Sequence, residues 1–294
     1  MAITFRSRLA PDAETRWLEA LRSALPNDQI STDPTAEAEI AIVANPPPGA
    51  LAAIPGLRLV QSAWAGVDGL LADPAFPKAV PLARLVDPTL GQQMAQAIAA
   101  HVLSLHRQAP AYRAQQAQGQ WRQLAQPLAQ DRQIGFLGYG ELARACAGLL
   151  STIGFPVVAW SRSHGDIATV LSSDIVVNLL PLTPATRGFL GAATFAQMKR
   201  GAALINVARG AHVVEADLLA ALAEGQLSHA VLDVFETEPL PAEHVFWRHP
   251  QITVLPHVAA ITDPVSASAR IAANIARFRA GEPLEGLVSL DAGY

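Results

Sequence analysis

The sequence predicts an α/β protein made of two doubly wound parallel-sheet domains joined by long helices. Short apolar runs alternate with helix-favouring stretches over the first 90 residues, and this alternation returns in the second half of the chain. Such alternation is typical of parallel sheets covered by helices. A chain of 294 residues with 51% hydrophobic residues is long enough for two cores. We expect residues 1–90 and 264–294 to form one domain and residues 91–263 the other.

The elements of the first domain follow from apolar patterning. Strands are expected at residues 3–5, 40–44 and 57–61, and helices at 11–25 and, returning from the end of the chain, at 264–279. A long Ala- and Gln-rich helix over residues 91–107 leads toward the second domain. Residues 112–130 are polar and partly helical, and we expect Trp121 to anchor this segment.

The second domain begins with a strand, a glycine turn, a helix and a second strand. The apolar run 134–137 stops in Gly138-Tyr139-Gly140, a helix is expected over 141–150, and residues 157–160 are again apolar. Glycines at this spacing let the backbone amides of the turn and the N-terminus of the helix approach a pyrophosphate. The small Ala143 lets the helix pack closely on the strand. An ordinary tight turn is the alternative. We predict a Rossmann-type dinucleotide domain, with further strands at 175–180, 203–207, 230–234 and 252–255.

The residues after the second strand indicate which dinucleotide binds. An NAD site places an acid about 20 residues beyond the turn, whereas an Arg there accommodates a 2′-phosphate. Here Ser161-Arg162-Ser163 stands at that place, and the first acid is Asp166. A guanidinium binds phosphate well, and the serines add hydroxyl donors. NADPH is therefore predicted over NADH; a solvated loop arginine is the alternative.

Three polar residues follow later strands of the second domain. Arg209, Glu238 and His257 each come shortly after an apolar run, where open α/β sheets bind ligands. Together they suit reduction of a 2-keto acid. Arg209 would hold the carboxylate, His257 would protonate the keto oxygen, and Glu238 would orient the imidazole and stabilise its charged form. Each residue taken singly has a structural explanation as well.

Composition excludes several other classes of protein. A net charge of −4 offers no basic surface for nucleic acid. No apolar run is long enough for a membrane span, and the N-terminus lacks a signal-peptide core. Cys146 is the only cysteine, and no His, Cys or carboxylate set has metal-ligand spacing. We expect a soluble cytoplasmic protein without a metal.

These motifs resemble the D-isomer-specific 2-hydroxyacid dehydrogenase family, and they are most similar to its glyoxylate/hydroxypyruvate reductase A branch. The resemblance covers nearly the whole chain after residue 57, and the ordered Arg, Glu and His set is its most specific part. It is carried by Ala65-Gly-Val-Asp68, Ile134-Gly-Phe-Leu-Gly-Tyr-Gly140, Trp160-Ser-Arg-Ser163, Asn178-Leu-Leu-Pro181, Leu204-Ile-Asn-Val-Ala-Arg-Gly210, Leu232-Asp-Val-Phe-Glu-Thr-Glu-Pro239, Trp247-Arg-His-Pro250 and Pro256-His-Val-Ala-Ala260.

The resemblance implies a flavodoxin-like substrate domain, a cleft between the domains for catalysis, and a homodimer formed through the cofactor domain. Glyoxylate, hydroxypyruvate or another short 2-keto acid would be the substrate, bound by Trp64, Ala65, Gly66, Arg209 and His257. The implied cofactor-binding residues are Gly138, Tyr139, Gly140, Glu141, Leu142, Ser161, Arg162, Ser163, Leu180, Pro181, Thr186, Val207, Ala208, Arg209, Asp233, His257, Ala259 and Ala260.

Three departures from the family pattern bear on these expectations. Bulky Trp64 stands where the family often has glycine, so it either narrows the substrate pocket or packs in the core. The charge of Glu141 would repel a pyrophosphate unless it points outward. Only residues 161–173 separate the second strand from Asp174. So short a connection leaves room for little helix, and we expect the protein wall beside the adenine to be more open.

Related functions remain as alternatives. A different 2-keto acid could be the substrate within the same family. A formate dehydrogenase is disfavoured, because that branch pairs its histidine with Gln rather than with Glu. A 3-phosphoglycerate dehydrogenase is disfavoured by Arg162 and by the lack of an appended regulatory domain after Tyr294. A nucleotide-sensing protein, like the family's transcriptional corepressors, would retain the same three residues but use disordered tails, which this sequence does not show.

Overall fold

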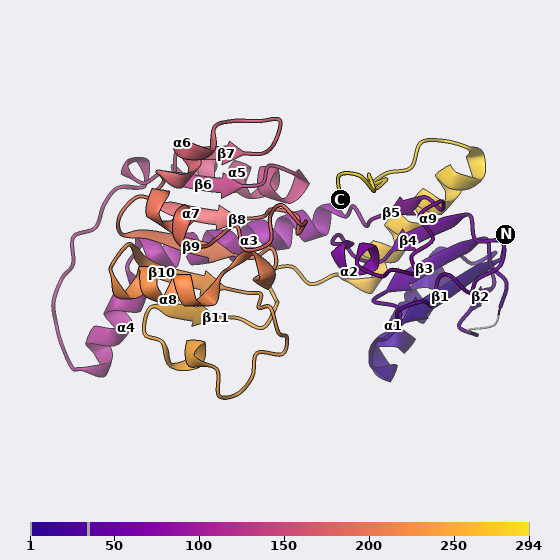
Figure 1. Ribbon diagram of the computed structural model, residues 1–294, viewed down its shortest axis with the longest axis horizontal. Helices are drawn as coiled ribbons and strands as arrows, with labels where there is room; N and C mark the ends of the chain where they lie inside the picture. The colour runs from indigo at the N-terminus through magenta and orange to yellow at the C-terminus, as the bar shows by residue number, and fades with distance from the viewer. Residues whose placement is uncertain (1, 34–35, 294) are drawn as a thin grey trace. The chain divides into compact units, whose positions relative to one another are not determined.

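The structure is a computed structural model that describes residues 2–33 and 36–293. The chain divides into two compact units (Figure 1). The first unit comprises Met1–Thr89 and Thr262–Tyr294, and the second comprises Leu90–Ile261. Helix α3, Pro88–His106, contains the first boundary within its first turn.

The first unit contains a parallel sheet in the order β2-β1-β3-β4-β5. Its strands are β1 (Ile3–Ser7), β2 (Ile30–Ser31), β3 (Ile40–Ala44), β4 (Leu59–Ser62) and β5 (Leu82–Ala83). Apolar patterning in the sequence predicts β1, β3 and β4 but not β2 and β5. Strands of two residues are too short to show any hydrophobic alternation.

Two long helices pack against each other in this unit. Helix α1, Pro11–Ala24, begins with proline and has Asp12 and Glu14 in its first turn, which suits the positive end of a helix. Helix α9, Pro264–Ala280, is capped by Asp263, whose carboxylate accepts a hydrogen bond from the Ser266 amide at 2.8 Å. Contact between α1 and α9 returns the end of the chain to the first unit. Helix α2 is the short segment Asp68–Leu71.

The second unit contains a parallel sheet in the order β11-β10-β9-β8-β6-β7. Its strands are β6 (Ile134–Leu137), β7 (Val157–Trp160), β8 (Ile175–Asn178), β9 (Ala202–Asn206), β10 (Leu227–Leu232) and β11 (Ile252–Val254). Its further helices are α4 (Ala109–Ala117), α5 (Glu141–Ile153), α6 (Ile167–Leu171), α7 (Ala192–Gln197) and α8 (Glu215–Ala223).

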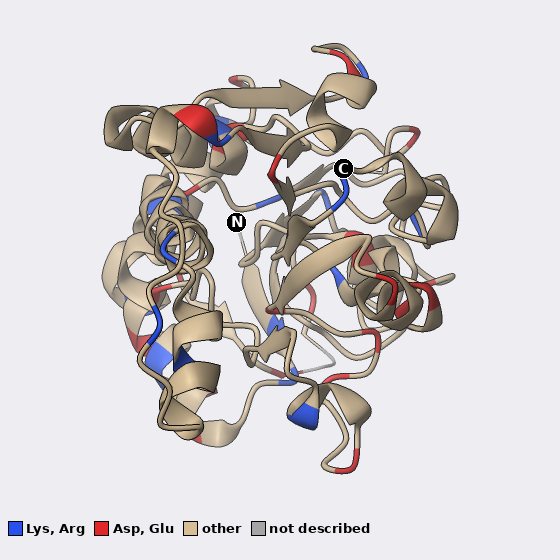
Figure 2. Cartoon of the chain, turned by 90° about the vertical axis from the view of Figure 1, so that its left-hand side faces the viewer, with Lys and Arg blue, Asp and Glu red and all other residues tan. Residues whose placement is uncertain are grey.

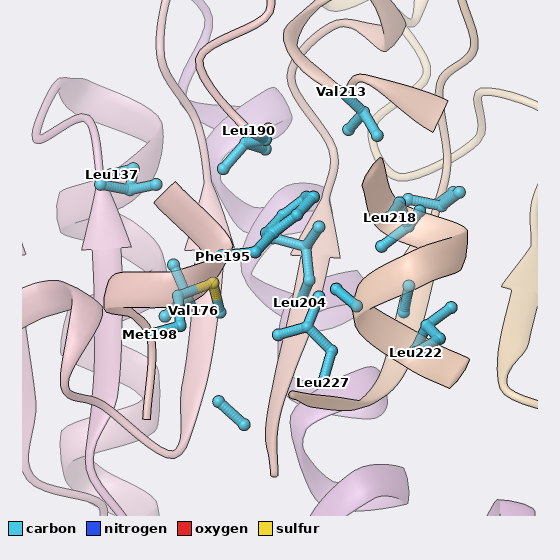
Figure 3. Close-up of a cluster of buried hydrophobic side chains, with 14 of the residues drawn as sticks. Leu137, Val176, Leu190, Phe195, Met198, Leu204, Val213, Leu218, Leu222 and Leu227 are labelled. Atoms are coloured by element: carbon cyan, nitrogen blue, oxygen red, sulfur yellow. The ribbon is translucent and has the colours of Figure 1, made fainter. Parts of the chain in front are cut away.

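Both faces of this sheet are covered by hydrophobic clusters. On one face Val176 and Leu204 pack with Phe195 of α7 and Leu218 of α8 (Figure 3). On the other face the alternate residues of β8 and β9 pack with α3 and α5. Burial on both faces explains why these strands are almost continuously apolar in sequence. Cys146 belongs to the second cluster, and burial raises the pKa of its thiol to about 12, which makes it an inert core residue.

The segment that follows α4 is exposed along most of its length. Trp121 has 97% of its surface accessible, and Leu128 has 61%. The prediction that Trp121 anchors the segment within this fold is therefore wrong. A tryptophan in a polar stretch is usually buried, but here the 118–128 segment follows an extended path away from the sheet of its own unit (Figure 1).

The distribution of charge and the hydropathy of the helices bear on which large partners the molecule could contact. Acidic and basic positions are interspersed over the elements that face the viewer in Figure 2 and form no continuous basic stretch. Within residues 2–33 and 36–293, no helix combines the length and the apolar character that crossing a bilayer requires.

Candidate functional site

The glycine turn after β6 leads directly into α5. Gly138 has a φ of +94°, and a Cβ there would lie 2.6 Å from the carbonyl oxygen of Leu179. Only glycine fits where this turn passes the chain that follows β8. Gly140 caps α5, and the position that its Cβ would occupy has no other atom within 4 Å. An anion can approach the unpaired amides at the start of α5 through this open space.

Glu141 and Leu142 form the first turn of α5. The side chain of Glu141 is 66% exposed, and its Oε1 lies 3.9 Å from Nη1 of Arg144. The carboxylate therefore points into solvent and is partly balanced by a neighbouring cation. Ala143, the small third position of the motif, is buried in the core.

A tight turn follows β7. The Ser161 amide donates to the His164 carbonyl at 2.8 Å, and the His164 amide donates to the Ser161 carbonyl at 3.1 Å. These two bonds place Arg162 and Ser163 at the tip of the turn. Helix α6 then has only five residues, as the short connection implied.

Asp166, the first acid after β7, is engaged in capping α6. Its Oδ2 accepts hydrogen bonds from the Thr169 hydroxyl at 2.9 Å and from the Thr169 amide at 3.0 Å. These hydrogen bonds lower the pKa of Asp166 below its usual value, and the bond from the Thr169 hydroxyl has the larger effect. The first carboxylate after β7 is therefore engaged by the start of α6.

The chain after β8 forms a second wall beside the glycine turn. Leu180 is buried, and its amide donates to Oδ1 of Asn178 at 3.2 Å. The Thr186 hydroxyl donates to the Pro181 carbonyl at 2.7 Å, which closes the loop over residues 181–186. These bonds hold in place the residues expected on the adenosine side.

Val207 and Ala208 are buried after β9, and Arg209, which follows them, is half-buried. The backbone carbonyl of Arg209 accepts from Nδ2 of Asn206 at 3.0 Å, and its Nη1 donates to the Ala208 carbonyl at 2.7 Å. The buried side chain of Asn206 thus fixes the backbone of Arg209.

A buried polar network lies beneath that turn, and sequence reasoning missed it. Asn178 Nδ2 lies 3.0 Å from both Asn206 Oδ1 and His212 Nδ1, and His212 Nε2 lies 3.3 Å from the Pro181 carbonyl. All three side chains are fully buried. The available signal was the asparagine that ends each of the two apolar strands β8 and β9.

Asp233, after β10, holds the loop that carries His257. Its carboxylate accepts from the Val258 amide at 2.8 Å and from the Ala259 amide at 2.9 Å, and its carbonyl accepts from the His257 amide at 2.8 Å. Ala259 is buried and Ala260 half-buried. The loop is therefore fixed at three successive amides.

His257 and Glu238 are hydrogen-bonded to each other. His257 Nδ1 lies 2.9 Å from Glu238 Oε2, and Glu238 Oε1 accepts from the Phe235 amide at 2.9 Å. Because an ionised carboxylate can only accept, Nδ1 carries the proton and Nε2 is left for another partner. The backbone of His257 has a φ of +55°, which is rare outside glycine and typical of functional positions.

Sheet order accounts for the grouping of these residues. Arg209 follows β9, Asp233 and Glu238 follow β10, and His257 follows β11. These three strands are parallel neighbours, so their carboxyl ends lie at one edge of the sheet. That edge presents a guanidinium, a carboxylate and an imidazole.

Trp64, Ala65 and Gly66 belong to the first unit and are half-buried. The indole of Trp64 meets that of Trp17 edge-on, with ring centroids 5.5 Å apart. This contact accounts for a bulky residue at position 64 by packing. Among the described residues, no group of His, Cys, Asp and Glu side chains is arranged to hold a metal ion.

Known proteins of similar sequence point to one family. Residues 99–259 match the family described as D-isomer specific 2-hydroxyacid dehydrogenase, NAD binding domain. The chain is 42% identical to glyoxylate/hydroxypyruvate reductase A of Serratia proteamaculans over 300 residues, which cover 95% of this chain and 96% of the relative. The same enzyme of Photorhabdus laumondii is 41% identical with the same coverage.

Solved structures are similar over the full chain. A D-isomer specific 2-hydroxyacid dehydrogenase from Xanthobacter autotrophicus, in complex with NADPH and MES, has a TM-score of 0.93 and 38% identity. An NADPH-dependent glyoxylate/hydroxypyruvate reductase from Sinorhizobium meliloti, in complex with NADP and sulfate, has a TM-score of 0.92 and 36% identity. Each match covers 100% of this chain and 99% of the other.

Proposed function

Because the chain belongs to the D-isomer-specific 2-hydroxyacid dehydrogenase family, we propose that it reduces glyoxylate and hydroxypyruvate to D-2-hydroxy acids with NADPH. The observation that carries this proposal is the hydrogen bond between His257 and Glu238 at the edge of the sheet where Arg209 also lies. Relatives named glyoxylate/hydroxypyruvate reductase A support the choice of substrates.

The residues at this edge divide the reaction between them. Arg209 holds the substrate carboxylate and draws electron density toward the keto oxygen. His257 donates a proton from Nε2 to that oxygen, and Glu238 at Nδ1 stabilises the imidazolium and fixes its orientation. A nicotinamide held by the residues of the second unit would supply the hydride that the keto carbon takes up. The imidazole left neutral is reprotonated from solvent.

The second unit fits a dinucleotide. The open position at Gly140, the start of α5 and the close passage of Gly138 beside Leu179 form a cradle for a pyrophosphate. Leu180, Pro181 and Thr186 would line the adenosine side, and Val207, Ala208, Asp233, Ala259 and Ala260 would surround the nicotinamide. We assign the cofactor to this unit and the remaining substrate contacts to Trp64, Ala65 and Gly66 of the first.

NADPH preference rests on the turn after β7. Arg162 and Ser163 lie at its tip, and Asp166 is engaged in capping α6 rather than positioned for a ribose hydroxyl. Two structural relatives were solved with NADPH or NADP. The test compares kcat/KM for NADPH and NADH in the wild type and in Arg162→Ala. An unchanged preference in the variant would remove the assignment to this turn.

Substrate class is tested by following NADPH oxidation with glyoxylate, hydroxypyruvate and larger 2-keto acids. Turnover with the two short acids, giving the D-isomer from hydroxypyruvate, is the expected result. Turnover confined to larger acids would support the reduction of 2-keto acids but would overturn glyoxylate and hydroxypyruvate as the substrates. No turnover with any acid, with intact NADPH binding, would favour a nucleotide-sensing protein.

The protein is further proposed to be a homodimer formed through the cofactor-binding unit. The support comes from the segment after α4, where Trp121 is 97% exposed and Leu128 is 61% exposed. Two large apolar side chains left exposed on one segment suit an interaction surface. A second copy of the chain would cover them.

A further inference from the structure

A stack of rings joins the two turns assigned to the cofactor. Tyr139 lies within the glycine turn after β6, and His164 closes the turn after β7. Their ring centroids are 4.5 Å apart with an interplanar angle of 21°, which is a stacked geometry. Arg144 of α5 adds a cation, with Cζ 5.4 Å from the centroid of Tyr139.

The turn after β7 needs such a support because of its place in the sheet. Strand β7 is the last strand of the sheet order, so the turn has a neighbouring strand on one side only. Beside it lies a half-open hollow of about 550 Å³, lined by Tyr139, Arg144, His164 and Asp166 among others. His164 lines that hollow, and the ring of Tyr139 is its stacking partner.

The position of His164 determines the position of the turn tip. Two backbone hydrogen bonds link Ser161 and His164, so Arg162 and Ser163 between them move with the His164 backbone. A guanidinium that is already placed loses less conformational freedom when it binds a phosphate. Stacking on Tyr139 therefore pre-organises this tip relative to the pyrophosphate turn.

We propose that Tyr139 and His164 are a positioning pair that sets the selectivity for a 2′-phosphate, and hence for NADPH over NADH. The inference rests on the proposed role of Arg162 and adds two residues to it. His164 acts here through its ring stack rather than by direct contact with the phosphate. Direct contact would require the imidazole nitrogens, whereas stacking requires only a flat ring.

The test measures nucleotide binding rather than turnover. Dissociation constants of adenosine 2′,5′-bisphosphate and of AMP are determined by calorimetry for the wild type, Arg162→Ala, His164→Ala and His164→Phe. We expect His164→Ala to weaken the bisphosphate about tenfold and AMP by less than about twofold, since an aromatic pair contributes of this order. His164→Phe keeps the ring and should restore selectivity.

The outcomes separate this inference from the proposed cofactor. If Arg162→Ala loses selectivity while His164→Ala keeps it, the stack has no positioning role and the inference is wrong. If His164→Phe behaves like His164→Ala, the imidazole contacts the phosphate itself and the stacking argument is overturned. If Arg162→Ala keeps selectivity, the cofactor proposal fails and the inference fails with it.

Discussion

His257 and its loop are held by hydrogen bonds to two acidic residues. Glu238 engages Nδ1 at 2.9 Å, while Asp233 accepts hydrogen bonds from three amides of the loop over residues 257–259. The left-handed backbone of His257 costs conformational energy that these bonds offset. A residue fixed in this way suits a proton donor, which must meet its acceptor within hydrogen-bond reach.

At this scale we predict that His257→Ala lowers kcat by roughly 10²- to 10⁴-fold, the usual contribution of a positioned acid or base. Glu238→Gln should lower kcat less, because the imidazole stays but its charged form loses a counter-charge. Rates of NADPH oxidation at saturating substrate measure both variants. The thermal midpoint of each variant serves as the control for folding. Equal activity of His257→Ala and the wild type at every pH would remove the proton-donor role.

A second residue-scale prediction concerns His229 on β10. It is 8% exposed, and its Nε2 lies 2.9 Å from the Thr253 hydroxyl. Burial, followed by the charges of His249 and Arg113, lowers its pKa from 6.5 to about 4. Between these values the unfolded chain binds a proton that the folded chain does not bind. Stability therefore falls as pH falls through this window, by about 3 kcal/mol.

The measurement is the free energy of unfolding in urea for the wild type and for His229→Gln. Glutamine can donate a hydrogen bond to Thr253 but does not titrate. The variant should lose less stability than the wild type between about pH 7 and about pH 5. Parallel losses in the two proteins would show that His229 does not contribute to the acid limb.

At the scale of elements, the loops after β9 and β10 are in van der Waals contact at one glycine. A Cβ at Gly210 would lie 1.8 Å from the carbonyl carbon of Phe235. Gly210 follows Arg209, and Phe235 lies in the loop that carries Glu238. The close passage therefore sets the spacing between the guanidinium and the carboxylate.

We predict that Gly210→Ala lowers kcat/KM by about 10²-fold, the effect of a displacement near 1 Å in an active site. The thermal midpoint should fall as well, because the two loops must separate. Gly148→Ala in the middle of α5 is the matched control. A Cβ there has no other atom within 4 Å, so activity should stay and stability should not fall. Full activity in Gly210→Ala would show that the spacing is unimportant.

At the scale of the whole molecule, the exposed segment after α4 predicts association. Trp121→Ser removes the largest exposed apolar side chain of this segment. We expect the wild type to have the mass of a dimer by light scattering at micromolar concentration and the variant to shift toward the monomer. Trp247→Ser, which removes a 49% exposed tryptophan elsewhere in the same unit, is the control and should leave the mass unchanged. A monomeric wild type would overturn the homodimer.

Local patterns in the sequence were enough for the α/β class, the strands of the second unit and the glycine turn. The run Ile134–Leu137 and the glycines after it are adjacent in the chain, and burial on both faces makes each parallel strand a continuous apolar run. Two-residue strands such as β2 and β5 lack this signal. Tryptophan is usually buried, so the exposure of Trp121 could not be predicted from its residue type.

Arg209, Glu238 and His257 could each be assigned to the end of a strand from sequence, because an apolar run followed by a polar residue is a local pattern. Their grouping depends on the order β11-β10-β9, and the support of the Arg209 backbone depends on Asn178, Asn206 and His212 meeting in the interior. Contacts between residues far apart in the chain leave no periodic trace in sequence. The stack of Tyr139 on His164 is of this kind, since it exists only because parallel strands place the ends of β6 and β7 side by side.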